Sequence, residues 1–193
     1  MAKKSSSKRL LHILGLTLVL LAVLTGTFFL ADFISQSETA QRVIATMGYP
    51  GVLLVAFISG ISAVSPIPPG AFVPLFTSAG LWLPLIIAML ILGTTLADFI
   101  GYFFGKYSIG FVEKHYPELY TRIQKLDIDN KIILFSFVIL YAALMPFPNE
   151  AFLIPLAFIG VPLKRFVIPL VLGTTVYHVL TAYGAEGLFR LFF

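Results

Sequence analysis

Long apolar runs separated by short polar segments dominate the pattern along the chain. A basic stretch over residues 1–9 precedes an apolar run over residues 10–31, and two further long apolar runs cover residues 84–104 and 166–189. A helix needs about 20 consecutive apolar residues to cross the hydrocarbon core of a bilayer. The pattern therefore predicts an all-α integral membrane protein with about three full transmembrane helices.

The first apolar run has two interpretations. A secretory signal peptide has the same charged start, but its apolar core covers only about 7–15 residues and ends at a cleavage site of small residues. The run over residues 10–31 is longer, and no convincing cleavage site follows it. We therefore favour a retained transmembrane helix behind a cytoplasmic basic tail, residues 1–9, in a multi-pass protein of the cell membrane whose N-terminus is cytoplasmic.

Proline interrupts two shorter apolar stretches of the chain. Residues 51–65 and 132–145 are too short to span a bilayer, and apolar sequence resumes after each break. Proline cannot continue a helix because it lacks the backbone donor and clashes with the preceding turn. We predict two re-entrant helical hairpins facing each other, rather than long kinked helices, with tips that line a cavity. The tip residues are Pro66, Pro68, Pro69 and Gly70 in the first hairpin, and Pro146, Pro148 and Asn149 in the second.

The two hairpins belong to an internal duplication with a register of eighty residues. Residues 66–105 and 146–185 share eleven identities in forty positions, including a Pro-x-Pro and a Leu-Gly-Thr-Thr motif. We predict one membrane domain over residues 51–185, in which repeat one (51–105) and repeat two (131–185) are joined by an amphipathic linker (106–130). One full crossing separates the hairpins, so the repeat is inverted, as in many transporters.

Three ionisable side chains fall within the apolar core of this domain. Asp98 and His178 occupy equivalent positions in the two repeats, and Glu150 lies at the second tip. Charge at this depth is costly, so such residues usually face a cavity or each other. We expect the pseudo-twofold axis to bring Asp98 and His178 together, and we interpret Glu150, with Asp98 close by, as a proton-responsive centre. The neighbouring polar candidates for substrate or proton binding are Thr94, Thr174 and Tyr102.

These polar residues leave two interpretations open. They form either a protonatable site that binds a head group or relays protons, or a set of hydrogen bonds that only holds the helices together. The composition, 59% hydrophobic and 11% charged without any cysteine, gives no signal for nucleic-acid binding, a thiolate metal site or a cofactor. The motifs of common enzyme classes are also missing. We expect a protein that is not an enzyme, whose partners are membrane lipids and, as an option, coupling protons; a homo-oligomer stays open.

Residues 50–185 resemble the DedA family of membrane proteins, also called the VTT or SNARE-associated-Golgi-type domain. Residues 66–70 resemble the family's Pro-x-x-Pro-Gly-Glu tip, and residues 93–106 resemble its Gly-x-x-x-Gly/Ala-Asp-x-x-Gly-Tyr-x-x-Gly-Arg segment. Pro146 to Pro148 stand where the second tip falls, and residues 160–166 resemble the stretch that follows it. The chain would be a divergent member.

The resemblance implies two facing re-entrant hairpins and the movement of lipids between leaflets. The expected function is that of a flippase or scramblase of phospholipid or polyprenyl-phosphate type, with proton coupling as an option. The chain departs from the family pattern because Ala71 replaces the first acidic residue, and Met145 and Ala151 replace a pair of arginines. Since arginine is the natural ligand of phosphate, the substrate stays open. The alternatives are a proton-coupled small-molecule transporter and a non-transporting membrane scaffold.

Overall fold

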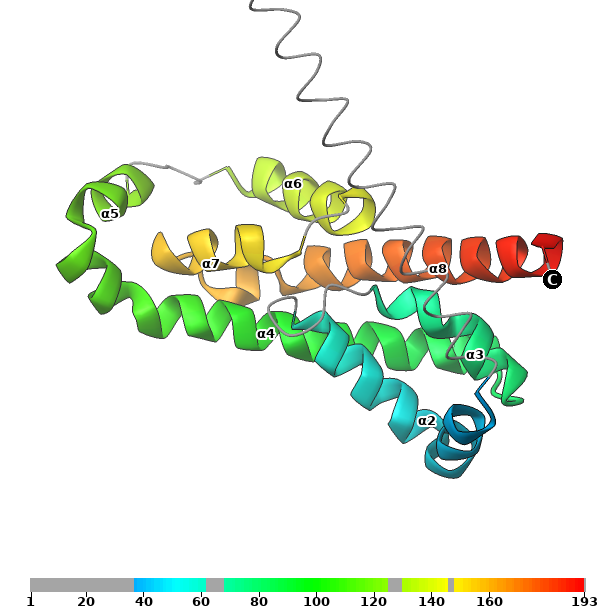
Figure 1. Ribbon diagram of the computed structural model, residues 1–193. Helices are drawn as coiled ribbons and strands as arrows, with labels where there is room; N and C mark the ends of the chain where they lie inside the picture. The colour runs from blue at the N-terminus through cyan, green and yellow to red at the C-terminus, as the bar shows by residue number, and fades with distance from the viewer. Residues whose placement is uncertain (1–36, 62–67, 125–129, 146–147, 193) are drawn as a thin grey trace, which may run out of the picture.

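The computed structural model describes residues 37–61, 68–124, 130–145 and 148–192, and this part of the chain is helical without strands (Figure 1). The predicted all-α class is confirmed. The basic tail, the run over residues 10–31, and the tip residues Pro66 and Pro146 lie outside the described residues. The helices are α2 (Glu38–Gly60), η1 (Pro69–Phe72), α3 (Val73–Ser78), α4 (Leu83–His115), α5 (Pro117–Gln124), α6 (Lys131–Leu144), α7 (Glu150–Phe158), η2 (Leu163–Arg165) and α8 (Val167–Phe192).

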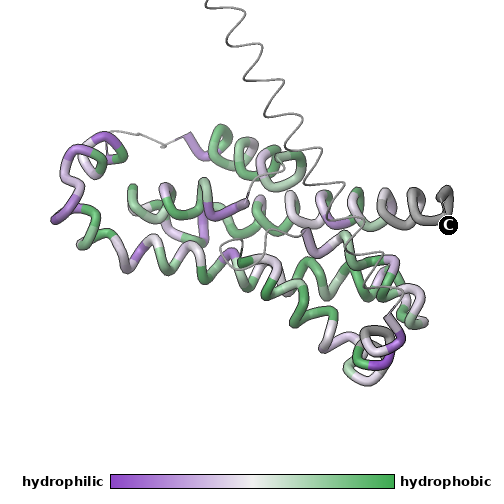
Figure 2. Tube along the Cα trace, in the orientation of Figure 1, coloured by the Kyte–Doolittle hydropathy of each residue, from purple (hydrophilic) through white to green (hydrophobic). Residues whose placement is uncertain are grey.

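Two of these helices are long and apolar enough to cross a membrane. They are α4 and the part of α8 from Val167 to Gly184, and Figure 2 shows hydrophobic positions along most of both. They suggest a membrane protein, as the apolar runs predicted. Figure 1 shows that α4 and α8 run in opposite directions through the middle of the molecule.

The helix that contains the first predicted span, residues 84–104, is longer than that span. Helix α4 does not end at residue 104 but continues to His115 and contains 33 residues, a length of about 50 Å at 1.5 Å per residue. It therefore includes the first part of the expected linker. The helix ends where Tyr116 leaves the helical region (φ −137°, ψ 57°), because the following Pro117 disfavours helical geometry at the residue before it.

Glycine residues allow α2 to approach α4 closely and α6 to approach α8 closely. A Cβ atom at Gly93 of α4 would lie 2.7 Å from the Leu53 carbonyl oxygen of α2, and one at Gly173 of α8 would lie 2.8 Å from the Ile139 carbonyl oxygen of α6. Gly93 and Gly173 are eighty residues apart. Small residues that allow such backbone contact are typical of helix packing in membranes.

The returning end of each hairpin is bonded to an earlier part of the chain, to α2 in the first case and to α5, the helix before α6, in the second. At the first, the Trp82 backbone N–H donates to the Tyr49 hydroxyl at 3.1 Å. At the second, Gln124 Nε2 donates to the Phe158 carbonyl oxygen at 2.7 Å. In each case the chain leaves along one helix (α2 or α6), turns, and comes back along a shorter one (α3 or α7) to the end from which it started.

The local backbone repeats at the predicted register of eighty residues. Gly80 and Gly160 have φ values of +83° and +76°, the left-handed conformation that glycine adopts at the end of a helix. The residue after each glycine donates its N–H five positions back, Leu81 to the Phe76 carbonyl and Val161 to the Leu156 carbonyl. These are Schellman turns, and they end α3 and α7 in the same way.

The apolar core consists of two clusters, one for each hairpin. The first is built mainly from α2, α3 and the start of α4, but it includes Ala182 of α8. The second is built mainly from α6, α7 and the start of α8, but it includes Tyr102 of α4. Tyr102 and Ala182 are again eighty residues apart, so each long helix contributes an equivalent position to the core of the other half.

Candidate functional site

Thr94 and His178 form the contact that sets the register of the two long helices. Thr94 Oγ1 lies 3.0 Å from His178 Nε2, and both side chains are buried. The Thr94 hydroxyl also lies 2.8 Å from the Leu90 carbonyl oxygen of its own helix. Because a hydroxyl has one proton and a carbonyl can only accept, we assign that proton to Leu90. His178 therefore donates from Nε2, and its Nδ1 is an acceptor.

Asp98 lies one turn further along α4 and contacts the second hairpin tip. Its side chain is 3% exposed, and its Oδ2 accepts a hydrogen bond of 3.0 Å from Asn149 Nδ2. Asn149 directly precedes α7, so this bond fastens the start of that helix to α4. The Glu150 carboxylate is close enough for its charge to act on Asp98. The predicted proximity of Asp98 and Glu150 is thus present.

The expected contact between Asp98 and His178 is not formed. Each has another partner, Asn149 for Asp98 and Thr94 for His178. The prediction assumed that equivalent positions of the repeats face each other. In an antiparallel pair with Thr94 opposite His178, one turn forward on α4 is level with one turn back on α8. Asp98 is therefore level with Thr174, which is also one of the predicted site residues.

Two polar atoms on α8 are buried in this layer without a hydrogen-bond partner among the described residues. They are Thr174 Oγ1 and His178 Nδ1, on side chains that are 3% and 1% exposed. The next residue, Thr175, differs because its hydroxyl bonds the Val171 carbonyl oxygen at 2.7 Å. Residues four apart on a helix lie on the same face, so both unpartnered atoms belong to one face of α8. Thr95 Oγ1 on α4 is a third such atom.

The two hairpin tips lie against equivalent positions of the opposite long helix. A Cβ atom at Gly101 of α4 would lie 2.8 Å from Glu150 Cγ, and one at Gly70 would lie 2.8 Å from Thr181 Oγ1 of α8. The backbone also repeats, since Ala71 donates to the Pro68 carbonyl at 3.0 Å and Ala151 donates to the Pro148 carbonyl at 3.1 Å. Gly101 and Thr181 were not among the predicted site residues, although the eighty-residue register points to both.

Tyr102 lies outside the polar layer, contrary to the prediction. Its hydroxyl donates to the Val161 carbonyl oxygen at 3.0 Å, and its ring packs edge-on against Phe166. It follows Asp98 by one turn, but its long side chain reaches the Schellman turn after α7. Tyr102 therefore stabilises the far end of the second hairpin.

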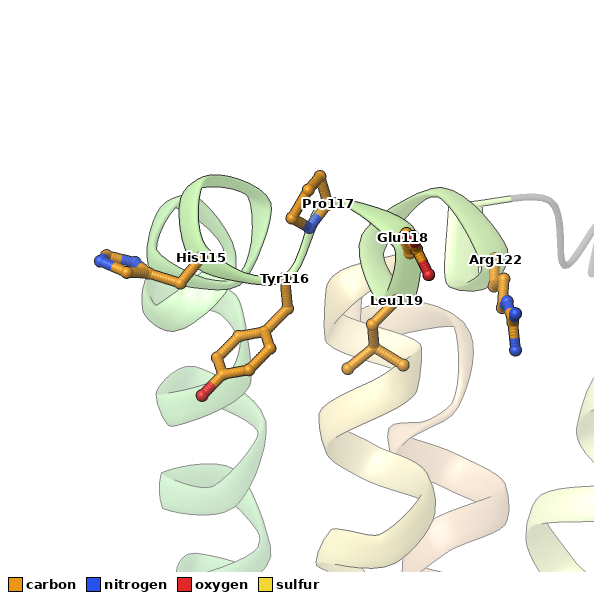
Figure 3. Close-up of a pocket in the computed structure, with 6 residues that line it drawn as sticks. All are labelled: His115, Tyr116, Pro117, Glu118, Leu119 and Arg122. Carbon is orange, nitrogen blue, oxygen red and sulfur yellow. The ribbon is translucent and has the colours of Figure 1, made fainter.

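A separate open hollow of about 430 Å3 lies at the corner between α4 and α5. Figure 3 shows its lining, which comes from the end of α4 and from α5: His115, Tyr116, Pro117, Glu118, Leu119 and Arg122. The start of this lining is 17 residues beyond Asp98 on one helix, a separation of about 25 Å. The hollow contains none of the predicted site residues.

Comparisons with protein-family models, with curated proteins and with solved structures gave no match to this chain. The resemblance to the DedA family therefore stays a prediction that rests on the motifs alone.

Proposed function

We propose that this chain is a multi-pass protein of the cell membrane, with a cytoplasmic N-terminus, that moves lipids between the two leaflets as a flippase or scramblase. In this proposal the two hairpins are re-entrant and belong to an inverted repeat. The lipid head group passes the polar layer between α4 and α8, while the acyl chains stay in the surrounding hydrocarbon. The residues that line this path are Thr94, Asp98, Asn149, Glu150, Thr174 and His178.

The bonds at the returning ends of the hairpins support the re-entrant arrangement. If Tyr49 and Trp82 lie together, and Gln124 and Phe158 lie together, then neither hairpin carries the chain across the bilayer. Helix α4 then provides the one crossing between them, which turns the second hairpin to the opposite side. Broken backbone at membrane depth needs a protein-lined or water-filled surrounding, and transporters use such breaks to form sites near the midplane.

The observation that carries the functional proposal is the hydrogen bond between Asn149 and Asp98. It places a buried carboxylate of an apolar helix directly against a hairpin tip. An ionisable group in the centre of a bilayer costs at least about 2.5–3.5 kcal/mol on insertion scales, and such groups usually mark a transport path. Glu150, at the same tip, keeps the role of a proton-responsive centre within this proposal.

A membrane scaffold is the second candidate function. It is favoured by the bonds from Thr94 to His178 and from Asn149 to Asp98, which join segments far apart in the sequence and would hold the bundle together. A scaffold needs the hydrogen bonds but not the charge. Replacing Asp98 by an isosteric amide therefore separates the two functions.

The test uses the full chain in vesicles of phosphatidylcholine and phosphatidylglycerol with a trace of an acyl-labelled fluorescent phospholipid. Dithionite added outside destroys only outer-leaflet fluorophores, so lipid movement appears as additional loss of signal. We expect the wild-type chain to move labelled lipid from the inner leaflet to the outer leaflet, where dithionite destroys it. Asp98→Asn should slow this movement by at least about tenfold, which corresponds to about 1.4 kcal/mol. Glu113→Gln, at an exposed site of the same helix, is the matched control and should behave as wild type.

Two results would contradict the proposal. If the labelled lipid of the inner leaflet is protected equally well in vesicles with the wild-type chain and in vesicles without protein, the scaffold is favoured. Full lipid movement by the Asp98→Asn variant would show that the carboxylate has no role in the transport path.

A further inference from the structure

We infer that the polar layer between α4 and α8 binds a primary ammonium group, presented by the head group of an aminophospholipid. This inference rests on the proposed lipid transport and specifies its substrate class. It is drawn from the hydrogen-bonding capacity of the atoms that form the layer. The atoms are the Asp98 carboxylate, His178 Nδ1 and Thr174 Oγ1.

The α8 side of the layer offers acceptors that lack donors. His178 Nε2 is committed to Thr94, which makes Nδ1 a buried lone pair with no donor among the described residues. Thr174 Oγ1, one turn away, likewise has no hydrogen-bond partner in the described part of the chain. Leaving a buried polar group unsatisfied is costly. A ligand with several N–H donors would satisfy both atoms at once.

The α4 side of the layer supplies a buried carboxyl group, whose ionised form a bound ammonium would stabilise. Asp98 is level with Thr174, is buried, and receives one neutral hydrogen bond, from Asn149. Among pairs of residues that the structure describes, the one side-chain ion pair joins Arg42 and Glu38 at an exposed site. No described lysine or arginine therefore pairs with Asp98, and Glu150 is a second acidic residue near it. The layer thus combines a carboxyl group that has no cationic partner among the described residues with two unpartnered polar atoms.

A primary ammonium complements this layer better than other head groups. It carries a positive charge and three N–H donors. A quaternary ammonium carries the charge without any N–H, so it cannot donate to His178 Nδ1. A phosphate without an attached amine cannot form an ion pair with the acidic side chains, and the described part of the layer has no arginine of the kind that phosphate prefers. The expected order of preference is phosphatidylethanolamine, then phosphatidylcholine, then phosphatidylglycerol.

The test compares three tracers that carry the same fluorescent acyl chain and differ only in head group. Each is added in trace amount to vesicles of phosphatidylcholine and phosphatidylglycerol that contain the full chain, and dithionite accessibility is followed near neutral pH. We expect the phosphatidylethanolamine tracer to move about threefold to tenfold faster than the phosphatidylcholine tracer, the effect of one hydrogen bond. The phosphatidylglycerol tracer should be slowest.

Two threonine variants check the assignment to this layer. Thr174→Val keeps the shape and removes the unpartnered hydroxyl, so the preference for the phosphatidylethanolamine tracer should shrink. Thr175→Val removes a hydroxyl that is already bonded within α8, so the preference should stay. Equal loss in both variants would place the recognition elsewhere.

Binding is measured separately from movement. In detergent, mixed micelles with phosphatidylethanolamine should raise the unfolding temperature of the wild-type chain more than micelles with phosphatidylglycerol, and Asp98→Asn should abolish the difference. Equal movement of all tracers, or faster phosphatidylglycerol, would overturn the ammonium inference while lipid transport survives. If no tracer moves, lipid transport fails, and the binding measurement alone decides: a specific shift supports the ammonium site and no shift rejects it.

Discussion

The two hairpin tips meet the opposite long helix at equivalent positions. The larger side chain of each contact belongs to the long helix at the first tip and to the hairpin at the second. At the first tip the hairpin supplies Gly70 and helix α8 supplies Thr181. At the second tip the hairpin supplies Glu150 and helix α4 supplies Gly101. Either arrangement leaves room for one side chain, so the same backbone packing is reached by two different residue pairs.

This comparison separates the parts of the fold that the duplication preserves from the parts that it does not. The Schellman turns at Gly80 and Gly160 and the close packing at Gly93 and Gly173 are the same in both halves. The chemistry is not the same, because the second tip brings an amide and a carboxylate to Asp98, whereas the first brings Pro69 and Gly70 to α8. The backbone is symmetric and the polar site is one-sided.

The largest expected effect tests the symmetric part. Gly93→Leu and Gly173→Leu would each force a side chain into the backbone of a neighbouring helix, at 2.7 Å and 2.8 Å from a carbonyl oxygen. We expect each to destabilise the fold by about 3 kcal/mol or more, the upper end for overpacking. Size-exclusion chromatography and thermal unfolding in detergent give the measurement.

Gly110→Leu is the control for this prediction, because a Cβ atom at Gly110 meets nothing within 4 Å. It should leave stability unchanged or slightly higher. A marked difference between the two core variants, with one folding normally, would show that the two halves are not packed alike.

A smaller effect tests the one-sided part. Asn149→Ala removes the hydrogen bond to Asp98 and should cost about 1–3 kcal/mol, the usual penalty for leaving a buried polar group without its partner. Exchanging the partners, with Asp98→Asn and Asn149→Asp together, should recover most of that loss because the bond can form again. Thermal unfolding of the single and double variants gives the coupling between the two positions. An additive double variant would mean that the bond contributes nothing to stability.

The smallest effect sharpens the comparison of the tips. Gly70→Ala places a Cβ atom 2.8 Å from the hydroxyl oxygen and 3.1 Å from the branched Cβ carbon of Thr181, whereas Gly101→Ala meets the flexible side chain of Glu150. We expect Gly70→Ala to cost about 1 kcal/mol more, within the range of overpacking. Thr181→Gly should relieve Gly70→Ala, because the pair then resembles the second tip. Equal costs for both alanine variants would remove the distinction that we draw.

Much of the fold follows from the sequence because local rules decide it. The ends of α2 and α6, a few residues before the Pro-x-Pro motifs, and the turns at Gly80 and Gly160 depend on backbone stereochemistry that adjacent residues carry. The continuation of α4 beyond the span was not predicted, because the charged segment from residue 106 onward was assigned to the linker. The helix instead continues until Pro117 stops it, a signal that the sequence also contains.

The partners in the site were harder to predict. Asp98, Thr94 and His178 were identified as candidates because polar groups are rare in apolar helices. Their partners depend on the register of an antiparallel pair, which a sequence repeat does not fix. The bond between Asp98 and Asn149 joins positions 51 residues apart and forms only once the second hairpin has packed on α4. Such a contact has no local sequence signal.

The most direct test of the central claim is the sidedness of the two hairpins. The chain contains no cysteine, so single cysteines at Met47 and Trp82, and at Lys164 for the other side, report without interference; all three residues are exposed. Labelling intact cells with an impermeant maleimide should modify the cysteines at positions 47 and 82 and spare the one at 164 until the membrane is opened. Modification of only one of positions 47 and 82 in intact cells would mean that the first hairpin crosses the membrane, and would contradict the inverted repeat.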